Sequence, residues 1–158
     1  MTPEEMWERA ARVWKLESRE IERLTRTVDR AAFLSPADAP HGALGAVQSG
    51  DVAVLVSKGG GTAELVSLLP PLKAKGAFLV AVTERNDSAL ARAADLTMRV
   101  KVEQKVNDLD MLATASTLAV IAVFDAVAIC LVGLAGYTRE RFSVIHPGGA
   151  VGERAGRP

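Results

Sequence analysis

Short apolar runs, each closed by residues that favour turns, alternate with helical patterns along the middle of this chain. VAVLV (52–56) stops before a run of glycines, AFLVAV (77–82) stops before TERND, and LTMRVKV (96–102) is more alternating. Apolar residues at helical spacing fill the intervals at 62–75 and 87–94. Strands that are almost wholly apolar and separated by helices are typical of a parallel sheet with both faces covered. The pattern therefore predicts an α/β fold.

Two segments precede this alternating region. Residues 1–28 begin with Thr2 in an N-cap position and repeat apolar residues at helical spacing, which predicts an amphipathic helix. AAFL (31–34) stops at a serine-proline pair and is predicted to be a further strand. We therefore expect an N-terminal helix over 1–28, a domain over 29–153 and a fraying tail over 154–158.

Residues 112–134 form a long apolar stretch with a single charged residue, Asp125, near its middle. The stretch is long enough to cross a bilayer, which takes about 20 apolar residues. A charge at mid-depth is costly, however, and no basic cluster flanks either end to set an orientation. A helix that is apolar on all sides can equally be buried in a core or in an oligomer interface. We expect such a buried or interface helix and no membrane association.

Composition narrows the classes of partner. The 158 residues fit one domain, and 19 basic residues balance 19 acidic ones, so no global charge draws the chain to nucleic acid. Aromatic residues make up only 4% of the chain, which leaves few platforms for stacked bases. Cys130 is the single cysteine, so an internal disulfide is excluded and a reduced cytoplasmic location is the simplest interpretation. The charged start, MTPEEMWERAARVW, is unlike a signal peptide.

Three consecutive glycines, 59–61, lie between a predicted strand and a predicted helix. In open α/β sheets ligands bind beyond the carboxyl ends of the strands, and a glycine loop entering a helix there offers backbone N–H groups and the positive end of the helix dipole to an anion. The spacing matches neither the P-loop nor the dinucleotide fingerprint. The alternative is a turn selected only for tight packing. The predicted phosphate-binding residues are Ser57, Lys58, Gly59, Gly60 and Thr62.

Both histidines lie beside glycine or proline in predicted loops, where functional residues concentrate. His41 is part of PADAPHGALG, and His146 is part of SVIHPGGAVG. An imidazole can transfer protons near neutral pH, but a lone histidine is also often structural, and composition leaves both roles open. No cluster has the spacing of metal ligands, so we expect neither a metal nor another cofactor.

A set of motifs then occurs in a recognisable order: HG-x-LG (41–45), S-x-x-G-x-T-x-E-L (57–65), VT-x-x-x-DS-x-LA-x-AAD (82–95), TAST (114–117) and F-x-x-x-HPGG-x-VG (142–152). Together they resemble the sugar isomerase (SIS) domain, and within it the arabinose-5-phosphate isomerase-like family. The resemblance implies a three-layer α-β-α sandwich with a flavodoxin-like parallel sheet. It also implies a sugar-phosphate ligand and a homodimer or homotetramer.

The resemblance assigns roles by position. The glycine loop would hold the phosphate group, and Ser116 and Thr117 would lie near the sugar. His146 would reach the active site, often that of the neighbouring subunit, and His41 would lie at the entrance of the same site.

An isomerase of this kind moves a proton between C1 and C2 of the sugar through an enediol, and needs a base and a group that opens the ring. The chain departs from the family pattern at places that serve this chemistry. Gly59 and Gly61 replace a serine and a glutamate of the family loop, and Lys105 stands near a family glutamate. Glu103 is the predicted base, with Glu84 as the other carboxylate beside a strand end.

A larger departure is the lack of the strand, glycine loop and helix with which the family sheet begins. In a flavodoxin-like order that strand is near the middle of the sheet. Its loss leaves three alternatives: the remaining strands pair across the gap, a partner chain supplies the edge, or the sequence omits a segment.

Three functions agree with these features. The first is an aldose-ketose isomerase acting on a phosphorylated sugar. The second is a non-catalytic module that binds or senses a sugar phosphate, which the missing carboxylates favour. The third is a structural oligomer in which the glycines only pack.

Overall fold

The computed structural model describes residues 31–102 and 113–155. The predicted helix over 1–28 and the candidate base Glu103 lie outside these residues. The chain forms two compact units. The described part of one unit holds the sheet and the start of helix α4 (Ala115–Leu134). The described part of the other holds the remainder of α4 and the C-terminal helices.

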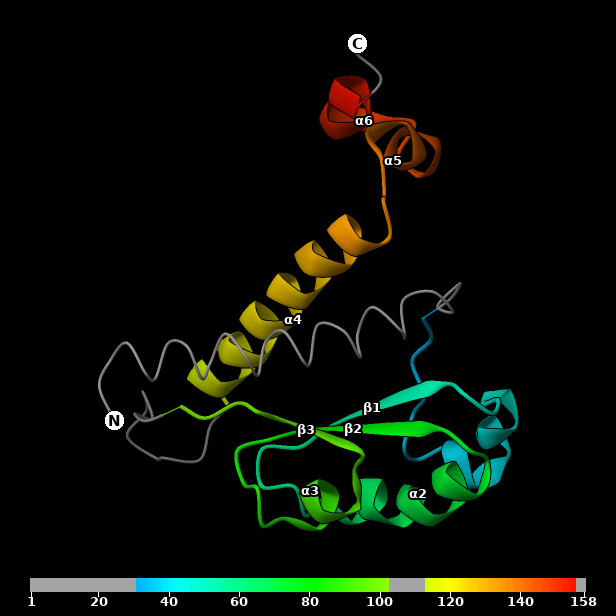
Figure 1. The fold of residues 1–158 in the computed structure, drawn as a ribbon, viewed down its shortest axis with the longest axis vertical. Coiled ribbons are helices and arrows are strands. Elements are labelled where there is room, and N and C mark those ends of the chain that lie inside the picture. Colours follow the sequence, from blue (N-terminus) through cyan, green and yellow to red (C-terminus); the bar gives the residue numbers. More distant parts are fainter. Residues whose placement is uncertain (1–30, 103–112, 156–158) are drawn as a thin grey trace. The chain divides into compact units, whose positions relative to one another are not determined.

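The first unit is built on a parallel sheet of three strands in the order β1-β2-β3 (Figure 1). The strands are β1 (Val52–Val56), β2 (Phe78–Thr83) and β3 (Leu96–Arg99). The Cα partners run in register, with Val54 opposite Val80 and Val80 opposite Leu96. The prediction of an α/β fold with a parallel sheet is confirmed.

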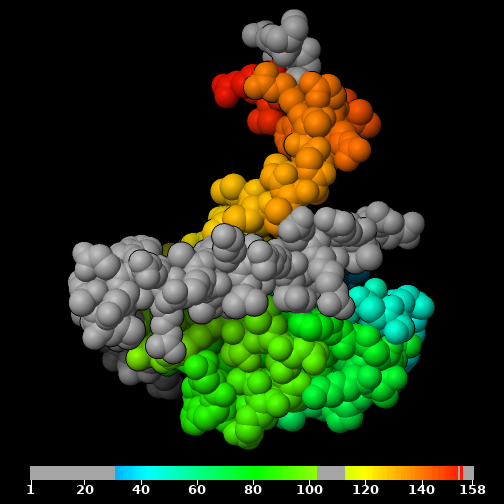
Figure 2. Space-filling model, viewed as in Figure 1, coloured from blue at the N-terminus to red at the C-terminus, as the bar shows by residue number. Residues whose placement is uncertain are grey.

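Helices α2 (Ala63–Ala74) and α3 (Ala89–Ala93) follow β1 and β2 and lie on one side of the sheet (Figure 1), as the intervals 62–75 and 87–94 predicted. In the space-filling view the green atoms of this region form the outer surface of the unit (Figure 2). Beneath that surface, alternate strand side chains pack against the helices. The buried residues of this core include Leu55, Leu79, Ala81, Leu68, Leu72 and Leu90.

The prediction of a strand at 31–34 is wrong. The segment has no regular structure, and Phe33 is 90% exposed. A four-residue run becomes a strand only where another strand pairs with it, and within the described residues β1 pairs with β2 alone. Two short 3-10 helices follow instead, η1 (Ala39–His41) and η2 (Ala43–Ala46).

The apolar stretch predicted at 112–134 forms helix α4 (Ala115–Leu134). It is the one helix among the described residues that is long and apolar enough to cross a membrane, with a mean hydropathy of 2.5. None of its residues is buried, and its exposed large side chains include Leu118, Ile121, Ile129 and Val132. The structure therefore does not display the burial expected for this helix.

The chain ends in two short helices, α5 (Arg139–Ile145) and α6 (Gly149–Ala155), which pack against each other. A Cβ atom at Gly152 would lie 2.2 Å from the carbonyl oxygen of His146, so only glycine allows this approach. Helix α6 continues through Ala155, the second residue of the segment 154–158 that is predicted to be a tail.

Leu79 provides a test of this core. Its side chain is fully buried in the central strand, so Leu79→Ala should lower the free energy of unfolding by about 2–5 kcal/mol in urea titrations. Phe33→Ala, which removes an exposed ring, is the control and should change stability by less than about 0.5 kcal/mol. Equal effects of the two substitutions would contradict the described packing.

Candidate functional site

The glycine loop is anchored to the carboxyl end of the sheet by its first two residues. The backbone N–H of Ser57 donates to the carbonyl oxygen of Val82 at 3.0 Å. The carbonyl oxygen of Lys58 accepts two hydrogen bonds of 2.9 Å, from the N–H of Glu84 and from Oγ1 of Thr83. The loop therefore begins at the sheet edge where parallel α/β folds bind ligands.

Gly60 holds the centre of the loop in its conformation. Its φ of +63° is left-handed, and a Cβ atom there would lie 2.1 Å from Oγ of Ser88. Its N–H donates to Oγ of Ser57 at 3.1 Å, and its carbonyl oxygen accepts from the N–H of Leu90 at 3.0 Å. The residue is buried, and its amide is used inside the fold.

Gly59 and Gly61, on either side, are exposed, and a Cβ atom at either would meet nothing within 4 Å. Among the described residues, the structure gives no hydrogen-bond acceptor within the fold for the N–H groups of these glycines or of Thr62. These amides are therefore the ones available to a ligand, whereas the amide of Gly60 is not.

The loop leads into α2 without a side-chain cap. Thr62 occupies the N-cap position, but its hydroxyl lies 2.8 Å from Oγ of Ser57 and makes no capping hydrogen bond to the helix. A helix of 12 residues whose first N–H groups lack a cap presents partial positive charge at its start. Lys58, exposed beside it, is a cation on the same loop. This end of the loop suits an anion.

Charged residues line a hollow of about 340 Å³ beyond the ends of β2 and β3. Arg85 and Asp87 form an ion pair of 2.9 Å there, and Nε of Arg99 donates to the carbonyl oxygen of Glu84 at 3.1 Å. The hydrogen bond and the charge of Arg85 lower the pKa of the Asp87 carboxyl. The residues that line the hollow are Glu84, Arg85, Asn86, Asp87, Arg99 and Lys101.

The other predicted site residues lie in separate elements. His41 ends η1 in the sheet unit, is exposed, and donates its backbone N–H to the carbonyl oxygen of Asp38. Ser116 and Thr117 belong to the first turn of α4, where Oγ1 of Thr117 donates to the carbonyl oxygen of Ala113 at 2.7 Å. The Thr117 hydroxyl is therefore engaged with its own helix.

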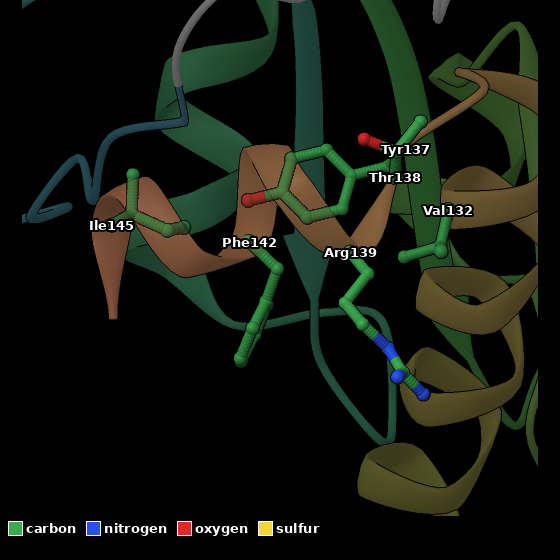
Figure 3. Close-up of a pocket in the computed structure, with 6 residues that line it drawn as sticks. All are labelled: Val132, Tyr137, Thr138, Arg139, Phe142 and Ile145. Carbon is green, nitrogen blue, oxygen red and sulfur yellow. The ribbon is translucent and has the colours of Figure 1, made fainter. Parts of the chain in front are cut away.

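His146 belongs to the C-terminal unit, where it follows α5. Its ring stacks on Phe142 with centroids 4.3 Å apart. Phe142 also lines an open, largely apolar hollow of about 500 Å³, formed by α4, α5 and the segment between them (Figure 3). The residues lining it are Val132, Tyr137, Thr138, Arg139, Phe142 and Ile145. The stacking sets the plane of the imidazole parallel to that of the Phe142 ring.

Two supporting residues were missed by sequence reasoning, Thr83 and Ser88. Thr83 holds the loop through Lys58, and Ser88 packs against Gly60 while its hydroxyl caps α3 through the N–H of Ala91. Both lie in the motif VT-x-x-x-DS, so a signal was present in the sequence. A threonine and a serine just beyond a strand end are candidates for hydroxyls that fix a neighbouring loop.

The loop geometry can be tested with two glycines. Gly60→Ala should destabilise the protein by about 1–3 kcal/mol, because alanine resists a left-handed φ and its Cβ meets Ser88. Gly61→Ala, with open space and no positive φ, should leave the melting temperature nearly unchanged. Urea titrations measure both effects, and an equal cost at the two positions would contradict the geometry.

The chain is similar to known proteins over most of its length. The family profile described as "SIS domain" matches residues 23–130. Arabinose 5-phosphate isomerase KdsD of Pseudomonas aeruginosa is 39% identical over 131 residues, which cover 83% of this chain and 40% of that protein. KdsD of Escherichia coli K12 is 39% identical over 122 residues, which cover 77% of this chain and 37% of that protein.

Solved structures give the same likeness. A Listeria monocytogenes protein described as a sugar-phosphate isomerase has 49% sequence identity and a TM-score of 0.74. A protein of E. coli CFT073, solved in complex with arabinose 5-phosphate, has 34% identity and a TM-score of 0.71. Each match covers 82% of this chain and 69% of the other chain. The chain spans about 40% of the length of the curated relatives it matches.

Proposed function

Because this chain belongs to the SIS domain family, we propose that it binds a sugar phosphate at the glycine loop and interconverts an aldose phosphate and its ketose phosphate. The observation that carries the proposal is the group of exposed N–H groups at Gly59, Gly61 and Thr62, at the uncapped start of α2. The relatives named for arabinose 5-phosphate make that sugar the first substrate to test.

Phosphate binding follows from the electrostatics of the loop. A phosphate dianion accepts hydrogen bonds from several backbone N–H groups at once, and the helix dipole of α2 adds to the attraction. Lys58 contributes a full positive charge from the same loop. Ser57 is 9% exposed, and its hydroxyl, hydrogen-bonded to that of Thr62, holds the two ends of the loop together.

The chemistry requires proton transfer at the sugar end. Ring opening exposes the C1 aldehyde, and a base removes the C2 proton while O1 gains a proton, which gives the enediol. O2 then loses its proton as C1 gains one, which gives the ketose. We assign the imidazole of His146, with that of His41, to ring opening and proton transfer. Glu103 is the proposed base, and Ser116 and Thr117 are proposed to contact the sugar hydroxyls. No metal or cofactor enters this proposal.

A second function, binding or sensing without turnover, is favoured by a specific feature of the loop. Gly59 and Gly61 carry no side chain where the family loop has a hydroxyl and a carboxylate. The amides that hold phosphate are kept, while two groups that could act on the sugar are absent. Binding can therefore persist where catalysis is weak.

The assembly and location belong to the same proposal. We propose a homodimer or homotetramer in the cytoplasm, without nucleic acid or membrane as a partner. The balanced charge and the single cysteine, Cys130, support this. Subunit contact would also allow His146 of one copy to serve the site of another.

Ligand binding is tested by thermal shift. Arabinose 5-phosphate should raise the melting temperature of the wild-type protein, and unphosphorylated arabinose should not, because the phosphate supplies the contacts to the loop. Ser57→Ala should reduce the shift at least threefold, since the loop loses the hydroxyl that fixes Gly60 and Thr62. Ser67→Ala, an exposed serine on α2, is the matched control. An undiminished shift in Ser57→Ala would remove the loop from the binding site.

Catalysis is tested at His146. His146→Ala should retain the thermal shift with arabinose 5-phosphate, while formation of the ketose phosphate should fall at least about a hundredfold, the scale of a positioned acid or base. Turnover is followed by the ketose product. Equal turnover in both proteins would exclude the imidazole from the mechanism, and no turnover in the wild type with normal binding would favour the sensing function.

A further inference from the structure

In the part of the chain that the structure describes, strand β1 has one open edge. Within the described residues it pairs with β2 only, where Ser57 N–H donates to Val82 and the N–H of Phe78 donates to the carbonyl oxygen of Asp51. In a parallel ladder alternate residues direct their N–H and C=O groups to opposite sides. The odd-numbered residues of this segment therefore face β2. Val52, Val54 and Val56 direct their backbone polar groups away from the sheet.

This edge lacks the features that protect natural edge strands. Such strands are normally blunted by lysine, proline, a bulge or an inward-pointing charge. VAVLV contains neither a charge nor a proline. Val54 and Val56, which alternate with the buried Leu55 and so lie on the sheet face away from α2 and α3, are each 46% exposed. A strand apolar on both faces is typical of the interior of a parallel sheet. The sequence of β1 is thus suited to two neighbours, and the described structure provides one.

We propose that a second copy of this chain supplies the other neighbour, with the two β1 strands pairing antiparallel about a two-fold axis at Val54. In this register Val54 faces its own equivalent and Val52 faces Val56 of the second copy. All outward-facing residues then meet as hydrogen-bonded pairs, which gives about six inter-chain hydrogen bonds. A shift by two residues would leave some of them unpaired. The two sheets would become one sheet of six strands.

The charges that flank β1 agree with this register. Asp51 precedes the strand and Lys58 follows it closely, and both are exposed. Antiparallel pairing about Val54 sets Asp51 of one copy opposite Ser57 of the other, next to Lys58. One Asp51–Lys58 pair forms at each end of the interface, and no like charges face each other. The contact is isologous, so it closes at two copies and leaves no β1 edge free.

This interface specifies the contact in the proposed homo-oligomer, and it is argued from the edge of β1 and not from sugar-phosphate binding. Val52, Val54 and Val56, whose backbone groups pair across it, precede the glycine loop, and only the flanking Ser57 and Lys58 belong to both. A substitution at the interface can therefore change assembly while ligand binding is retained, and the two proposals can fail separately.

The test is site-directed crosslinking in a Cys130→Ser background, which removes the native thiol. Val54→Cys should form an intermolecular disulfide under diamide, because equivalent Cα atoms of a hydrogen-bonded pair lie about 5.5 Å apart, within disulfide reach. Val56→Cys is the control, because Val56 is as exposed as Val54. In the proposed register the Cα atoms of residue 56 in the two copies are offset by about 13 Å along the strands. At least tenfold faster crosslinking at position 54 is expected. Equal rates, or no crosslink at 54, would overturn the proposal.

Sedimentation velocity provides a second readout. Wild type and Val54→Thr should sediment as a dimer, whereas Val54→Lys should sediment as a monomer, because two ammonium groups would face each other across the axis. The β1–β2 ladder is kept, since the amide of Val54 faces outward, and a thermal shift with arabinose 5-phosphate should be retained. A monomeric wild type would overturn the proposed interface. So would a dimer that persists in Val54→Lys but is lost in Ile129→Asp, because that result would place the contact on α4.

Discussion

The left-handed backbone of Gly60 is the constraint on which the candidate site depends. Its buried contact with Ser88 brings the turn after β1 against the turn after β2, and its amide is held by the Ser57 hydroxyl. With this central residue fixed inward, Gly59 and Gly61 are left on the outside with exposed amides. One glycine therefore gives the loop its shape, and two others give it a surface that a phosphate group can approach.

The strands and helices that this loop joins could be predicted because they depend on local pattern. The β-branched run of β1 was located at 52–56, and α2 and α3 were located from apolar spacing. The predicted strand at 31–34 failed because strand formation requires a neighbour, which a sequence window does not contain.

The site was predictable only in part. Glycines between a strand and a helix suggested exposed amides, but the sequence could not tell that Gly60 uses its own amide internally while its neighbours do not. That difference depends on a positive φ and on Ser88, which is distant in the sequence and close in the fold. The supporting role of Thr83, through the carbonyl of Lys58, likewise required the register of β1 against β2.

The hydroxyl of Thr62 has a further consequence. Because it is directed to Ser57, it is diverted from the capping hydrogen bond that an N-cap threonine usually makes, which is worth about 1 kcal/mol to a helix. The first turn of α2 therefore lacks the stabilisation that a capping hydroxyl would supply. A bound phosphate would take the place of the missing cap, so occupancy of the loop and order at the start of α2 would rise together.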